Sequence, residues 1–177
     1  MMSRTMTQAL LPKRVDGPKL VEVNQHLSGK IDSKQLTRLS AATLGCDPFV
    51  ECVADFDRDD ERHRLLIGRC EAKVVMECQR CLEDVSLDIR SEFTLAMVFN
   101  DDQAKALPKR LESIELDEDG RLELWEIFED ELLLCLPDFP MHPEGECQAY
   151  STGPEQDTAE EVKRPNPFDV LAQLKQK

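Results

Sequence analysis

Hydrophobic and polar residues alternate most regularly in the segment FVECVADFD, which spans residues 49–57. The apolar set is Val50, Cys52, Ala54 and Phe56, and charged residues fill most of the positions between them. Because successive side chains of a β-strand point to opposite faces, this pattern predicts a strand with one buried and one wet face.

Two longer segments continue the alternation, at residues 64–77 and 82–99, with the polar turn RDDERHR before the first of them. The three segments together predict an antiparallel meander, and Gly68 is a candidate β-bulge within it. Shorter apolar groups in residues 1–30, including Leu20 and Val21, are expected to add one or two short strands. A further short strand is expected at 112–116.

The segment RLELWEIFEDELLLCLP predicts the main helix, over residues 122–135, and Pro137 ends it. Its apolar side chains recur at three- and four-residue steps: Leu124, Ile127, Phe128, Leu132 and Cys135. A shorter helix is expected between an N-cap at Ser33 and a stop at Gly45. We therefore expect an α+β fold in which the long helix covers one face of the antiparallel sheet.

The composition changes after residue 143, which predicts three parts: an α+β domain over 1–143, a flexible acidic linker over 144–164 and a short helix over 165–177. The linker is polar and almost free of large apolar residues. Pro167 opens the terminal helix, whose apolar face is expected to consist of Phe168, Leu171 and Leu174. A helix of this length is marginal alone, so we expect these side chains to dock on the domain or on a partner.

Charge is distributed unevenly along the chain. The 22 basic and 36 acidic residues give a formal net charge of −14, which counts against a generic nucleic-acid groove and against docking on anionic lipid. Residues 1–40 hold seven bases and three acids, whereas residues 101–161 hold 19 acids and four bases. The acidic body is either a solvated surface or a face that attracts a basic protein partner.

The sequence indicates a cytoplasmic protein. No apolar run approaches the roughly 18 residues that a membrane-spanning helix needs, and the N-terminal residues form no secretory signal. The cysteines number seven, and this odd count without a signal peptide is typical of a reducing compartment.

A Cys-x2-Cys motif in ECQRCL, with Cys78 and Cys81, lies between two predicted strands. This is the spacing of a zinc knuckle, in which a tight turn points two thiolates at one metal ion. Zinc takes four ligands, and His142 and Cys147 in MHPEGEC are the natural candidates for the other two. The alternative is that these thiols are structural or unpaired. A thioredoxin-like redox pair is disfavoured, because that motif opens a helix after a strand.

We find no catalytic constellation and expect a protein that is not an enzyme. The phosphate-binding loop, the dinucleotide fingerprint, the serine-hydrolase elbow and the metalloprotease motif do not occur. His26 and His63 stand alone, and the carboxylates of Glu123, Glu126 and Asp130 are expected to form the wet face of the main helix.

Three motifs carry a resemblance to a known family. They are C-Q-R-C-L at residues 78–82, E-D-E-[LI]-[LI]-L-x-L-P at 129–137 and P-N-P-F-x-V-L-x-x-L at 165–174. Over roughly residues 8–177 the chain resembles the YceD family, the large ribosomal RNA subunit accumulation proteins, and it is most similar to the proteobacterial branch. The resemblance implies a role in the synthesis, processing or stability of large-subunit (23S) ribosomal RNA and no known enzymatic activity.

The main functional hypothesis is a ribosome-biogenesis factor that acts by binding a protein or RNA partner. A basic ribosomal protein or assembly factor is the favoured partner, and contact with ribosomal RNA can then be indirect. Phe168, Leu171 and Leu174 would then enter a groove on that partner. Two alternatives stay open. One is a metal-dependent RNA-processing enzyme, and the other is an RNA-binding protein that uses the bases of residues 4–38 to contact phosphates.

Overall fold

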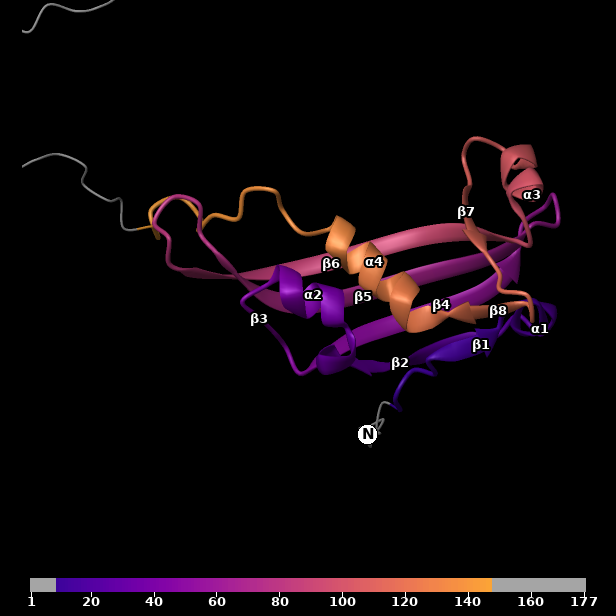
Figure 1. The fold of residues 1–177 in the computed structure, drawn as a ribbon, viewed down its shortest axis with the longest axis horizontal. Helices are drawn as coiled ribbons and strands as arrows, with labels where there is room; N and C mark the ends of the chain where they lie inside the picture. The colour runs from indigo at the N-terminus through magenta and orange to yellow at the C-terminus, as the bar shows by residue number, and fades with distance from the viewer. Residues whose placement is uncertain (1–8, 148–177) are drawn as a thin grey trace, which may run out of the picture. The chain divides into compact units, whose positions relative to one another are not determined.

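A twisted, mainly antiparallel sheet forms the frame of the protein (Figure 1). The structure is a computed structural model, and it describes residues 9–147. The central strands pair in the order β2, β4, β5, β6, each antiparallel to its neighbour. Their bounds are β2 (His26–Asp32), β4 (Phe49–Arg58), β5 (Arg64–Glu77) and β6 (Asp84–Val98). The expected α+β class and the antiparallel meander are confirmed.

Shorter strands complete the sheet. The two-residue β3 (Gly45–Cys46) pairs with β5, and β7 (Glu112–Glu115) pairs with the edge of β6. β7 runs parallel to β6, because the connection through α3 (Asp101–Ala106) is long enough to return the chain to the same end of the sheet. A separate ribbon joins β1 (Arg14–Asp16) to β8 (Arg121–Glu123).

The inner face of the sheet carries the core, as the alternation predicts. Val50, Cys52, Ala54 and Phe56 are all buried. The helix α4 (Leu124–Leu134) covers this face, and the Phe128 ring meets Phe93 of β6 edge to face at 5.5 Å. The helix begins at Leu124, two residues later than expected, because residues 121–123 pair with β1 instead. Burying such large side chains is the main source of stability in a domain of this size.

Gly68 does not form the expected bulge, since its register partners Ala54 and Phe93 belong to uninterrupted ladders on both sides. The reason for glycine here is packing. A Cβ atom at this position would overlap the ring of Phe93, which lies across the strand at Gly68. The ring can lie against the sheet only where a strand lacks a side chain.

Two expected local structures near the N-terminus differ in the structure. Leu20 and Val21 lie in α1 (Gly17–Glu22) and not in a strand. Asp16 caps that helix by accepting a hydrogen bond from the backbone N–H of Lys19, at 3.1 Å. The helix expected after Ser33 is broken at Leu36 into a 3-10 turn η1 (Ser33–Gln35), capped by Asp32, and α2 (Thr37–Ala42).

Residues 9–147 lie in one compact unit of the chain. Of the predicted linker, only residues 144–147 are described, and they form a turn in which the N–H of Glu146 donates to the carbonyl of Pro143 at 3.2 Å. The rest of the linker and the predicted helix over 165–177 lie outside the described residues. Among the described helices, none has the length and apolar character that crossing a bilayer requires.

Candidate metal centre

The tip of the β5–β6 hairpin forms a tight knuckle around the Cys-x2-Cys motif. The N–H of Leu82 donates to the carbonyl of Cys78 at 2.8 Å, and the N–H of Cys78 donates to the carbonyl of Glu83 at 2.8 Å. Leu82 takes a left-handed conformation, with φ of 61°, which closes the turn. Both cysteine side chains are buried, Cys78 completely. The knuckle therefore turns two thiols inward at the end of the hairpin.

The segment that follows α4 runs back to this knuckle. The N–H of Gln79 donates to the carbonyl of Pro140 at 2.8 Å, which joins the two segments directly. The guanidinium of Arg80 donates to the carbonyls of His142 and Pro143, at 3.4 and 3.5 Å. In Figure 1 the segment after α4 lies beside the end of the hairpin. Side chains 61 residues apart in the sequence thus meet at one place.

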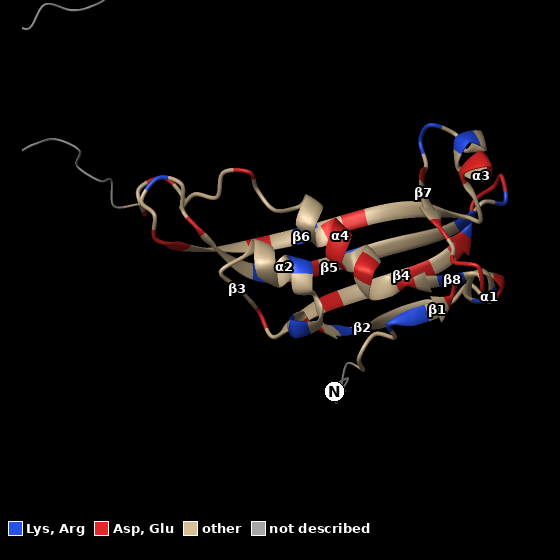
Figure 2. Cartoon of the chain, in the orientation of Figure 1, with Lys and Arg blue, Asp and Glu red and all other residues tan. Residues whose placement is uncertain are grey.

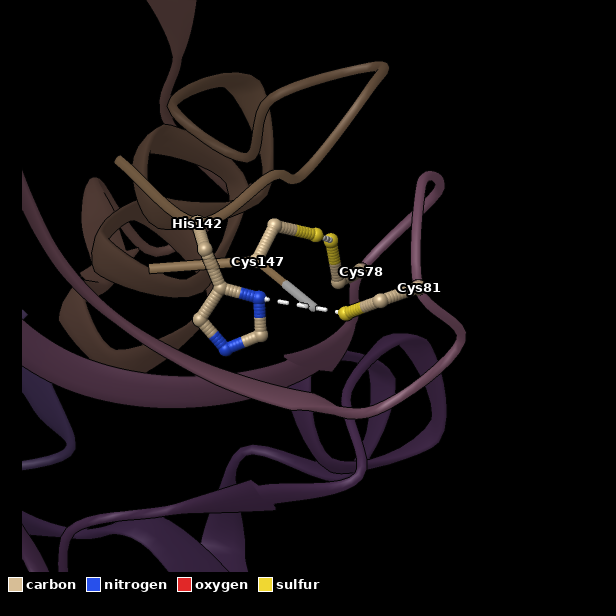
Figure 3. Close-up of side chains that lie close together, drawn as sticks. All are labelled: Cys78, Cys81, His142 and Cys147. Atoms are coloured by element: carbon tan, nitrogen blue, oxygen red, sulfur yellow. Dashed lines mark hydrogen bonds between the residues drawn. The ribbon is translucent and has the colours of Figure 1, made fainter. Parts of the chain in front are cut away.

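The four candidate ligand residues face one another in this region (Figure 3). The ligand atoms of Cys78, Cys81, His142 and Cys147 all lie within 4.8 Å of each other. The sulfur atoms of Cys78 and Cys147 are 3.7 Å apart, and the Cys81 sulfur lies 3.4 Å from Nδ1 of His142. The structure therefore brings together the four residues that the sequence analysis grouped, and metal binding itself stays a prediction.

The second ring nitrogen of His142 has its own partner. Nε2 lies 3.2 Å from the backbone carbonyl of Asp84, so it acts as the donor and carries the proton. Nδ1 then presents its lone pair to the three sulfurs. Histidines that ligate metals are held in this way, with one nitrogen on the metal and the other on a carbonyl or carboxylate.

The surroundings of the cluster shift the pKa values of Cys78 and Cys81 in opposite directions. Burial raises the pKa of Cys78, but backbone N–H groups of Arg80 and Cys81 outweigh it, and the pKa falls to about 5. The N–H of Glu83 lowers the pKa of Cys81, yet its contacts with Cys147 and burial raise the pKa to about 11. A hydrogen bond to Cys78 raises the pKa of His142. The site thus favours the thiolate form at Cys78.

Other cysteines of the chain have different surroundings. Cys52 and Cys70 are register partners on β4 and β5, where both are buried in the main core. Burial raises the pKa of each thiol, that of Cys70 to about 12. These residues pack as small hydrophobic side chains, in keeping with the inert behaviour of thiols in apolar surroundings.

A second group of potential ligands, Asp59, Glu61 and His63, lies in the β4–β5 turn. The ring of His63 contacts Asp59 at 2.9 Å, and the Arg110 guanidinium reaches both carboxylates at 3.4 Å. A cation of the chain therefore already occupies the position facing these acids. His26 likewise pairs with Asp55 across β2 and β4. Both histidines are thus hydrogen-bonded to carboxylates of the chain.

Sequence reasoning missed a polar residue in the core. Glu129, which the sequence analysis did not single out, is 5% exposed, whereas Glu126 and Asp130 on the same helix are exposed as expected. The Glu129 carboxylate accepts hydrogen bonds from the backbone N–H groups of Arg38 and Leu39, at 2.7 and 3.1 Å. The sequence does contain a signal for this burial. Glu129 stands four residues from both Trp125 and Leu133, so it lies on the same apolar side of the helix as these two residues.

The predicted partner-binding residues Phe168, Leu171 and Leu174 lie outside the described residues. The structure consequently places the candidate metal ligands and leaves the terminal segment as a prediction from sequence.

The fold and the side-chain cluster define the structural class of this protein. It is an α+β protein with a mainly antiparallel sheet, and a cluster of three cysteines and one histidine joins a hairpin tip to a segment distant in the sequence. The chain belongs to the family described as large ribosomal RNA subunit accumulation protein YceD, whose family model matches residues 66–175. The family resemblance drawn from the three motifs is thereby confirmed.

One relative extends the match to nearly the whole chain. The large ribosomal RNA subunit accumulation protein YceD of Haemophilus influenzae is 36% identical over 178 residues. The alignment covers 97% of this chain and 100% of that relative. No solved structure matches the chain significantly.

Proposed function

We propose that this protein supports the accumulation of large-subunit ribosomal RNA, and that it does so by binding a protein partner. The observation that carries the proposal is the 36% identity to an rRNA accumulation protein over 97% of this chain and 100% of that relative. The family model itself includes the C-terminal motif, so the match is not confined to the sheet and its helices.

The charge of the folded part supports a basic partner. Residues 101–147 hold 15 acids and four bases, and acidic positions gather around α3, β7 and β8 (Figure 2). A hollow between β7 and α4 has an apolar floor that includes Ile114 and Ile127. Glu115, Asp117, Glu123, Glu126 and Asp130 also line it, together with one base, Arg121. Three of these acids pair with Arg14 or Arg38, whereas Glu115 and Glu126 form no ion pair in the described part of the chain. Those two carboxylates are the groups available to attract a basic chain.

The bases near the N-terminus are largely engaged within the fold, which counts against the alternative of a basic arm gripping RNA. Arg14 pairs with Asp117 and Glu123, and Arg38 pairs with Glu129 and Asp130. Lys19 and Lys30 form further ion pairs. A phosphate would have to compete with these carboxylates for each base, so the segment offers little net attraction for RNA.

Binding without catalysis is supported by the roles of the histidines. His26 and His63 pair with surface carboxylates, and His142 belongs to the thiol cluster. Among these contacts, the one between His142 and the Cys81 thiol joins an imidazole to a nucleophilic atom, and both side chains belong to the cluster of four potential metal ligands. The alternative of a metal-dependent RNA-processing enzyme therefore has less support than a binding role.

The C-terminal segment supplies the second part of the proposed interface. Phe168, Leu171 and Leu174 stand at helical spacing in a segment too short to be stable by itself, which is typical of a peptide that folds into a partner's groove. The acidic surface and the C-terminal segment belong to one chain. Binding of either one to the partner would therefore raise the effective concentration of the other and strengthen the complex.

Crosslinking in cells tests the proposal, with both proteins and RNA identified on the purified chain. We expect a basic ribosomal protein or assembly factor on the wild type, and its loss from the Phe168→Ala/Leu171→Ala variant. Val23→Ala, which shortens an exposed apolar side chain of the folded unit, serves as the matched control and should keep the partner. Identical partners on all three chains would contradict the role of the terminal segment, and RNA without protein would contradict the binding mode.

A further inference from the structure

We infer that Cys78, Cys81, His142 and Cys147 form a closed tetrahedral Zn²⁺ site that clamps the segment after α4 to the tip of the β5–β6 hairpin. The inference rests on the positions of these side chains and is independent of the proposed function. It defines the ion, its geometry and its role in the structure.

The distances between the ligand atoms fit a tetrahedron around zinc. Two sulfurs at about 2.3 Å from Zn²⁺ stand roughly 3.8 Å apart at the tetrahedral angle, and a sulfur and an imidazole nitrogen stand roughly 3.5 Å apart. The Cys78–Cys147 sulfur distance is 3.7 Å, and the distance from the Cys81 sulfur to Nδ1 of His142 is 3.4 Å. The cluster thus has the size of a zinc coordination shell.

The donor set selects the metal. Thiolates and imidazole are soft or intermediate ligands that suit Zn²⁺, and the hard ions Mg²⁺ and Ca²⁺ prefer oxygen. Three sulfurs and one nitrogen supplied by the protein complete four-coordination, with no position left for water or substrate. Closed shells of this kind are structural, whereas catalytic zinc keeps one open position.

Arg80 provides the counter-charge. Three thiolates and one neutral imidazole around Zn²⁺ leave one net negative charge, which is costly in a buried site. The Arg80 guanidinium donates to the backbone carbonyls of His142 and Pro143, which places its positive charge beside the ligand-bearing segment. Arg80, which lies between Cys78 and Cys81 in the sequence, therefore balances the negative charge of the metal centre.

The local packing explains why a metal is needed here. Away from the main core, Cys78, Cys81 and Val85 form a separate cluster with only Met76, Leu87 and Cys147 packed against it. The joined segments have no regular structure, since β5 ends at Glu77 and α4 ends at Leu134. So little buried apolar area cannot by itself offset the entropy lost in fixing two loops, and metal ligation supplies the missing free energy.

Metal analysis of the full chain, purified without chelators, tests the inference. We expect about one zinc ion per chain and, after replacement by Co²⁺, the strong visible absorption bands of a tetrahedral thiolate site. Cys147→Ser should lower bound zinc at least about tenfold, because it removes one of the four ligands. Cys46→Ser, a substitution of a half-buried cysteine on β3, should keep the full complement.

Two further measurements keep the test independent of folding. The single tryptophan, Trp125 on α4, should keep its emission spectrum in Cys147→Ser, which shows that the sheet and helix remain folded. Removing zinc from the wild type should speed amide hydrogen exchange in residues 78–83 and 136–147 and leave β4 and β5 unchanged. Arg80→Gln should weaken zinc binding about tenfold, as loss of a residue that supports the ligands does.

Three results would overturn the inference. The first is a wild-type chain that contains no zinc and takes up no Co²⁺. The second is equal loss of zinc from Cys46→Ser and Cys147→Ser. The third is a disulfide between Cys78 and Cys147 in protein that is alkylated at the moment of cell lysis.

Discussion

Single residues decide how the helices join one another, and Glu129 of α4 is the clearest case. Within residues 9–147 it is the one buried carboxylate, and it replaces the N-cap that α2 lacks. Leu36, at the N-cap position, has no side chain that can accept a hydrogen bond, so the first N–H groups of α2 bond to an acid from α4. Arg38 then pairs with the same carboxylate at 3.0 Å.

Replacing this acid should therefore loosen both helices. We predict that Glu129→Ala lowers the free energy of unfolding by about 2 kcal/mol, because two backbone N–H groups and one guanidinium lose a charged acceptor. The control is Glu126→Ala, which changes an exposed acid one turn earlier and should cost about 0.5 kcal/mol or less. Urea denaturation measures both, and equal effects in the two variants would refute the capping role.

Gly68 allows a second prediction at the residue scale. Gly68→Ala should destabilise the protein by about 1–3 kcal/mol, because the new methyl group would displace the ring of Phe93 from the core. Gly45→Ala is the matched control, since its Cβ would meet Val75 at an ordinary 3.7 Å. That variant should be neutral or more stable by about 0.5 kcal/mol. The packing account fails if both variants unfold at the same urea concentration.

At the scale of elements, the longer a periodic hydrophobic pattern was, the more accurately it predicted the helix or strand. The three long strands and α4 were predicted within a few residues, because many repeats of a period identify an element. Leu20 and Val21 could not be assigned in that way, since two apolar neighbours fit a strand or a helix equally. Asp16 and Pro18 provide the start signal that favours the helix. The break at Leu36 follows from its burial in the core, which only the assembled fold shows.

The turn between β7 and β8 should make stability depend on pH. Asp117 accepts backbone hydrogen bonds from Arg121 and Asp119, at 2.8 and 2.9 Å, and it pairs with Arg14. The Arg121 N–H, followed by Arg14, lowers the pKa of Asp117 below its ordinary value. An acid with a lowered folded pKa stabilises the fold above its unfolded pKa of about 3.9, and the stabilisation disappears as the pH falls through the folded pKa.

Asp117→Asn keeps the acceptor oxygen but removes the titrating group. We predict that the wild type loses stability as the pH falls from about 5 to below the folded pKa of Asp117, and that the variant loses less. Glu118→Gln, at an exposed position with no side-chain hydrogen bond in the structure, should behave as the wild type. Urea midpoints at several pH values provide the comparison, and the turn has no such role if all three chains show the same dependence.

At the scale of the whole molecule, charge and topology together shape the function. The formal charge of −14 is the basis for proposing a partner other than bare RNA, and four N-terminal bases pair with acids of the same chain. The Cys-x2-Cys spacing predicted half of the cluster directly. His142 and Cys147 were named only as candidates for the other half, because the return of the chain from α4 has no local sequence pattern. Hydrogen bonds from Gln79 and Arg80 hold the returning segment at the knuckle.

The ratio of large- to small-subunit ribosomal RNA in cells is the measurement that tests the proposed function most directly. Cells lacking the gene for this protein should show a lower ratio than the parent strain. Expression of the wild-type chain should restore it, and expression of the Phe168→Ala/Leu171→Ala variant should not. A ratio that is unchanged when the gene is deleted would contradict the account.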